Sequence, residues 1–183
     1  LDGAARHRSR AGAAAVAEGE ALELATKGNW RKAHSALADA HGRGEEAELD
    51  GYFDQAFLAV AVDNDDKAQD SLRRVLRKRK TDREALFFVK FLYRAGEEWG
   101  PLAEVIKAEA GVLPGGDPFR LGVAYRDLIV LYRDELKQPT NVLTAYKELV
   151  EVDPGDVQVL DEYAALLEEL NRPQDLVPVL RMK

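Results

Sequence analysis

A short apolar motif recurs along the chain at a nearly constant interval, and it restricts the possible folds more than any other feature. Five segments begin with a turn and continue as amphipathic stretches, and their turn residues are Trp30, Asp65, Trp99, Pro139 and Pro173. The steps between these residues are 35, 34, 40 and 34. An apolar residue stands three positions after each turn residue, and another stands four positions later. Such i, i+4 pairs share one face of a helix, so the pattern predicts repeated helices.

Each of these predicted helices is preceded by a second amphipathic segment. The preceding segments cover residues 11–28, 45–62, 82–96, 118–136 and 156–171. The repeating unit is therefore a helix, a turn and a second helix. One such hairpin cannot bury its apolar face alone, whereas stacked hairpins share a continuous core. We expect an all-α chain of helical hairpins.

The repeat also predicts how the chain is divided. The five expected units cover residues 13–44, 46–80, 82–110, 118–153 and 156–183, after an N-terminal basic tail at 1–12. The Gly/Pro-rich stretch "GVLPGGDP" at 111–118 is expected to be an insertion loop, which explains the one longer step. Asp117 and Pro118 are suited to starting the next helix. Thr81 and Glu84 have the spacing of a capping box for the helix after residue 82.

Several of these segments resemble the tetratricopeptide repeat. The likeness is carried by the turns "KGNWRKA", "RAGEEWGPLA" and "LNRPQDLVPVL" and by the Asp153-Pro154 junction. Leu160, Tyr163, Ala164 and Leu167 follow that junction at the family's spacing. The resemblance implies a right-handed solenoid in which first helices line a concave groove and second helices face outward. It also implies that the groove holds peptides or other proteins.

A basic run stands out in a chain whose formal net charge is −7. Residues 73–83 contain seven cations and Asp82, a net +6 that leaves −13 for the rest. The cations are Arg73, Arg74, Arg77, Lys78, Arg79, Lys80 and Arg83. Most of them end an expected second helix, where cations complement the helix dipole and meet solvent. Docking of an acidic partner on this face, or binding of nucleic acid, is the alternative interpretation.

The groove candidates are the residues of the middle first helices that lie off their predicted core stripes. In the third unit the predicted stripe is Ala85, Phe88, Val89 and Leu92. The candidates from the second, third and fourth units are Phe53, Phe57, Arg83, Lys90, Tyr93, Arg94, Arg126 and Arg133. A groove with an apolar end and a cationic middle suits a short acidic peptide with aromatic or aliphatic anchors. Alternatively, Phe53 and Phe57 only pack against neighbouring helices.

Patterns that would indicate chemistry are absent from the sequence. It has no cysteine, no phosphate-binding or dinucleotide-binding glycine pattern and no nucleophile elbow. His34 and His41 are seven residues apart and have no obvious acidic companion for a metal site. We therefore expect a protein that is not an enzyme and that needs no cofactor and no metal.

The expected function is protein–protein interaction, as a module or scaffold within a larger chain or complex. The chain begins with Leu1, which suggests a processed or partial protein, and its longest apolar stretch, "FLAVAV", is too short to span a membrane. The lack of cysteine fits the cytoplasm, and the periplasm stays open. The alternatives are a nucleic-acid or regulator module that uses residues 73–83, and a repeat segment attached to a catalytic domain.

Overall fold

The computed structural model describes residues 16–42, 44–112 and 117–183, and these residues are helical apart from short connections. Residues 16–26 form a helix before α2. The following helices are α2 (Trp30–His41), α3 (Glu45–Ala61), α4 (Asp65–Lys78), α5 (Arg83–Ala95), α6 (Trp99–Val112), α7 (Pro118–Val130), α8 (Pro139–Val152), α9 (Val157–Glu169) and α10 (Pro173–Met182). A π-helix, η1 (Leu131–Glu135), continues α7. The described residues contain no β-strand.

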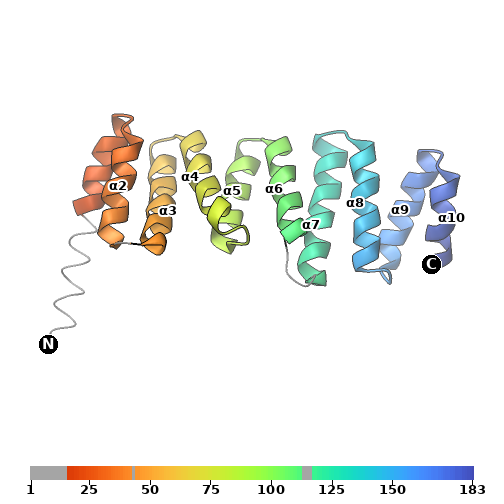
Figure 1. The fold of residues 1–183 in the computed structure, drawn as a ribbon. Helices are drawn as coiled ribbons and strands as arrows, with labels where there is room; N and C mark the ends of the chain where they lie inside the picture. The colour runs from red at the N-terminus through yellow and green to blue at the C-terminus, as the bar shows by residue number, and fades with distance from the viewer. Residues whose placement is uncertain (1–15, 43, 113–116) are drawn as a thin grey trace. The chain divides into compact units, whose positions relative to one another are not determined.

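The helices pack as antiparallel hairpins, as α3 with α4 and α7 with α8 show in Figure 1. The chain divides into two compact units, Leu1–Leu92 and Tyr93–Lys183. In the first unit α3 packs against both α2 and α4. In the second, α6, α7, α8 and α9 each pack on the next helix in sequence. Contact between sequence neighbours is the arrangement of a repeat array, so the predicted fold class is confirmed.

Each hairpin is closed by the same backbone device. One residue in the left-handed conformation follows each first helix, with φ between 53° and 74°, and these residues are Gly28, Asp63, Glu97, Lys137 and Asn171. Their spacing repeats the steps found in the sequence. In four of the turns the next N–H donates to the carbonyl five residues back, as Asn64 does to Ala59 at 2.9 Å. This is the bond pattern of a Schellman cap, which satisfies the last carbonyls of the first helix.

The predicted apolar pairs form the buried stripe of the second helices. Both members are buried in α2, α4, α6 and α8; Leu72, for example, is 0% exposed. The last hairpin differs, because Leu176 is half-buried and Leu180 is 48% exposed. Val179 is the buried residue of α10. No following helix covers α10 in the described structure, so only its side that packs on α9 is buried.

The helix starts agree with the sequence in one case and correct it in another. Asp117 caps α7 as predicted, since its side chain accepts from the Arg120 N–H at 3.2 Å. The predicted capping box of Thr81 and Glu84 is wrong, because Asp82 accepts from the Ala85 N–H at 3.0 Å. The basic tail expected at 1–12 lies outside the described residues, as do residues 113–116 of the loop expected at 111–118.

We expect a Gly28→Ala substitution to destabilise the first hairpin by about 1 kcal/mol. Gly28 has φ +74° and open space around its Cα, so the cost comes from the backbone alone. Gly100, in the first turn of α6, also has open space but no positive φ. Gly100→Ala should therefore stabilise the chain by about 0.5–1 kcal/mol. Urea melts of both variants would test this, and destabilisation by Gly100→Ala would contradict it.

Truncation of the two equivalent stripe leucines should have unequal effects. Leu72→Ala removes a fully buried side chain and should cost about 2–5 kcal/mol. Leu180→Ala removes a half-exposed side chain and should cost about 1 kcal/mol. Equal losses in chemical denaturation would show that the last hairpin is as enclosed as the second.

Candidate interaction surface

Of the two aromatic candidates on α3, Phe57 lies beside α5. Phe53 is half-buried, while Phe57 is 47% exposed. The Phe57 ring meets Phe88 edge-on, with 4.7 Å between ring centroids, and Phe88 lies 6.4 Å from Phe91. Phe57 thus packs on a neighbouring helix and still offers half of its surface to solvent. These rings form an aromatic cluster on the first helices of the first unit.

An exposed face of α5 alternates cations and aromatic rings. With 3.6 residues per turn, Arg83, Phe87, Lys90, Phe91 and Arg94 fall within about a third of the helix circumference. Phe87 is 67% exposed and Phe91 is 57% exposed. Arg83 and Arg94 are exposed and Lys90 is half-buried. The sequence had singled out the three cations but had missed the two phenylalanines between them.

The predicted outward position of Tyr93 is wrong, because its side chain is only 2% exposed. The buried stripe of α5 contains Leu86 and Tyr93, while Phe88, which was expected in it, is half-buried. The stripe is therefore centred on Val89 and is rotated toward Tyr93 from its predicted position. The prediction took the most apolar face of α5 alone as the buried one. Packing against neighbouring helices buries a slightly different face.

In the second unit, Arg126 and Arg133 line a cleft of about 410 Å³ between α7, η1, α8 and α9. Arg126 lies 2.6 Å from Asp156, and Arg133 makes two hydrogen bonds to Asp134, at 2.8 and 3.0 Å. The cleft brings these two predicted residues together. It also neutralises much of their charge, so this surface is less cationic than the sequence suggested.

One side of this cleft is lined by Tyr146, which is held by a ring contact and a hydrogen bond. Tyr146 of α8 stacks on Tyr163, with 5.5 Å between ring centroids, and donates a hydrogen bond to Glu162 at 3.1 Å. Burial and the Glu162 carboxylate raise the pKa of Tyr146 to about 12. The raised pKa extends the range over which the hydroxyl stays protonated and donates to Glu162 to higher pH than for an ordinary tyrosine.

Exposed large apolar side chains are unevenly distributed between the two kinds of helix. On α3, α5, α7 and α9 they are Phe57, Val60, Phe87, Phe91, Phe119, Val123, Val130 and Val157. None occurs among the described residues of α2, α4, α6 or α8, and three occur on the last helix, α10. The first helices therefore carry most of the apolar surface that stays in contact with water.

The basic run is partly neutralised by the preceding helix. Lys78 lies 2.6 Å from Glu48, and Arg79 forms an ion pair with Glu46. The Lys78 hydrogen bond lowers the pKa of the Glu48 carboxyl. Arg73, Arg77 and Lys80 have no ion pair within the described ranges. The run is thus an exposed helix end, some of whose cations have carboxylate partners on α3.

Comparisons with known proteins add little to this geometry. No protein-family model matches the chain, and no curated protein matches it significantly. The crystal structure of MamA shares 14% identity, covering 87% of this chain and 90% of that one, with a TM-score of 0.46. For MamA 41-end from Desulfovibrio magneticus RS-1 the identity is 14%, the coverages are 92% and 91%, and the TM-score is 0.44. These values are too low for properties of MamA to be assigned here.

The structure itself defines the chain as a helical-hairpin repeat protein. Within the residues that it describes, no helix combines the length and the apolar character needed to cross a membrane. The class of protein thus follows from its fold, and the function has to be argued from its surfaces.

Asp156 should contribute to stability in a pH-dependent way. The Val159 N–H that it caps, and then the Arg126 guanidinium, lower the pKa of its carboxyl below 3.8. Its contribution is therefore present above about pH 3.8 and is lost as the pH falls through the lower, folded-state pKa. Asp156→Ala should cost about 0.5–2 kcal/mol at pH 7 and less at pH 3. Asp156→Asn keeps the cap acceptor and should cost less at pH 7. Urea melts at both pH values measure this, and an equal cost of Asp156→Ala at both would contradict it.

Proposed function

We propose that this chain is a tetratricopeptide-like, non-enzymatic interaction protein that binds an extended segment of a partner protein on the exposed faces of its first helices. The observation that carries the proposal is the distribution of exposed apolar side chains. Large apolar groups that stay in water cost free energy, and contiguous sets of them often mark interaction sites. Here they gather on α3, α5 and α7 while α2, α4, α6 and α8 have none among the described residues.

The same faces indicate the chemistry of the partner. On α5, Arg83 is exposed and has no ion pair among the described residues, beside the exposed rings of Phe87 and Phe91. Apolar anchors of the partner would cover these rings, and acidic groups would meet the cations. On α7, Arg126 and Arg133 already have carboxylate partners, so an acidic ligand gains less from them. Apolar contact then supplies most of the affinity, and charge supplies specificity.

A selection from randomised 12-residue peptides displayed on phage would test this partner chemistry. We expect the recovered peptides to combine acidic residues with Phe, Trp, Leu or Ile. Synthetic versions should then bind in fluorescence anisotropy. Replacing Phe57 and Phe91 with serine should weaken this binding at least tenfold, about 1.4 kcal/mol. Both side chains are about half exposed, so the fold should tolerate the change.

The control for the apolar arm is the pair Val177→Ser and Leu180→Ser on α10, which changes apolar residues of similar exposure on a second helix. It should leave affinity within a factor of two. Loss of binding in the control but not in the Phe57 and Phe91 variant would overturn the first-helix assignment.

A charge-reversal arm separates the first helices from the basic run. Arg83→Glu with Lys90→Glu, both on α5, should weaken binding of the acidic peptides, by a smaller factor than the serine variant does. Arg73→Glu with Arg77→Glu, on the exposed side of α4, should change affinity little. If the second pair abolishes binding, or if only unrelated RNA and DNA bind with a steep salt dependence, the run at residues 73–83 is the site instead.

A further inference from the structure

A second cleft lies in the first unit, away from the aromatic cluster of α3 and α5. It has a volume of about 410 Å³ and is lined by α2, α3 and α4. Its lining residues are Trp30, Arg31, His34, Tyr52, Gln55, Lys67 and Arg74. Three of these seven side chains are permanent cations and none is an acid. This composition is unusual in a chain whose net charge is −7.

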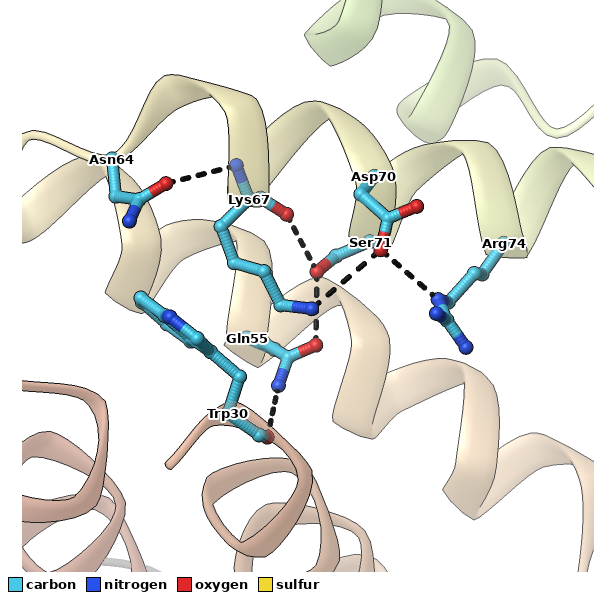
Figure 2. Close-up of polar contacts among 7 residues, drawn as sticks. All are labelled: Trp30, Gln55, Asn64, Lys67, Asp70, Ser71 and Arg74. Carbon is cyan, nitrogen blue, oxygen red and sulfur yellow. Dashed lines mark hydrogen bonds and ion pairs between the residues drawn. The ribbon is translucent and has the colours of Figure 1, made fainter. Parts of the chain in front are cut away.

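Two of the three cations of this cleft share one carboxylate. Figure 2 shows Lys67 and Arg74 of α4 on either side of Asp70, with the Lys67 Nζ and the Arg74 Nε 3.5 and 3.2 Å from its Oδ2. Arg31 has no ion pair among the described residues. Glu48, whose backbone carbonyl lies 3.4 Å from His34 Nε2, directs its carboxylate to Lys78. The group of three cations and Asp70 therefore keeps a formal charge of +2.

Aromatic rings hold the two α4 cations in place. The Lys67 Nζ lies 5.9 Å from the centroid of the Trp30 ring, and the Arg74 guanidinium lies 5.6 Å from that of Tyr52. Tyr52 in turn stacks on His34, with 4.1 Å between centroids. Cation–π contact restrains side chains that are otherwise mobile. The positive groups are thus partly ordered before any ligand arrives.

The wall of the cleft is fixed by a buried hydrogen-bond chain, which Figure 2 also shows. Gln55 is 2% exposed; its Nε2 donates to the Trp30 carbonyl at 2.7 Å, and its Oε1 lies 3.0 Å from the Ser71 hydroxyl. The chain ties α2, α3 and α4 together. Satisfied buried networks of this kind rigidify their surroundings, so the cleft does not need to be formed by its ligand.

We propose that this cleft binds the phosphoryl group of a phosphate monoester. Near neutral pH such a group carries a charge between −1.5 and −2, roughly opposite to the charge of the cleft. Two guanidinium groups offer planar forks and Lys67 offers a compact charge, which together are a common set for phosphate oxygens. A carboxylate would neutralise only half of the positive charge. The Trp30 and Tyr52 rings also line the cleft, and an organic group on the ester would contact them.

Trp30 provides a direct readout of binding. The chain has two tryptophans, so a Trp99→Phe background leaves only Trp30 emission. Phenyl phosphate, inorganic phosphate and acetate would be titrated at constant ionic strength. We expect a saturable change in emission with both phosphates and at least tenfold weaker binding of acetate. Tighter binding of phenyl phosphate than of inorganic phosphate would identify the ester as the ligand, and equal binding would identify free phosphate.

Three sets of substitutions locate the site. Lys67→Gln with Arg74→Gln should weaken phosphate binding at least tenfold. Asp70→Asn removes the competing carboxylate and should tighten it severalfold, a gain that a folding defect cannot imitate. The matched control is Arg73→Gln with Arg77→Gln on the same helix, which does not alter the lining of the cleft.

The control should change affinity less than twofold. The proposal is overturned if the control weakens binding as much as the Lys67 and Arg74 pair does, because attraction would then be non-specific. It is also overturned if Asp70→Asn weakens binding, or if acetate binds as tightly as the phosphates.

Discussion

The turn between the two helices of a hairpin determines which residues of the second helix face the core. One residue adopts a left-handed conformation, and the next N–H closes onto a carbonyl of the first helix. In all five turns of the described residues the second helix begins two residues after the left-handed residue, as α4 begins at Asp65 after Asp63. The fourth and eighth residues of the second helix, such as Ala68 and Leu72 of α4, are then the ones that reach the core. A helix that began one residue later would turn this stripe by about 100°.

The fixed phase has a consequence for the first helices. A second helix buries its apolar stripe within its own hairpin and against a neighbour, so its outer side is polar, as Arg73 and Arg77 show on α4. A first helix such as α5 has apolar residues on two sides. One side, with Val89 and Leu92, is buried, and the other, with Phe87 and Phe91, is exposed. Apart from α10, the exposed large apolar side chains of the described residues thus lie on first helices.

The sequence predicted the fold well because its strongest signals are local. The pairs Ala68–Leu72 and Leu102–Ile106 needed only the spacing of one helix. The π-helix at Leu131–Glu135 was not predictable in this way. In the turn that follows it, the Gln138 N–H donates to the carbonyl of Tyr132, six residues back rather than five. Signals that depend on a second helix were missed too, including the burial of Tyr93. The phenylalanines of α5 were within reach, since the face that singled out Lys90 also contains them.

The environments of the cations are a second feature that the sequence alone did not predict. The run at residues 73–83 reads as one positive block in the sequence, yet each cation meets a different environment when the chain folds. Lys78 pairs with Glu48, thirty residues away, and Arg77 faces solvent. Arg74 instead joins Lys67 beside Asp70, in a cleft that also contains Arg31, a residue from another helix. Helix packing therefore divides a single stretch of like charge into a neutralised part, a solvated part and a concentrated part. Arg74 is the cation of the run that lies in a cleft with two other cations, so its positive field adds to theirs.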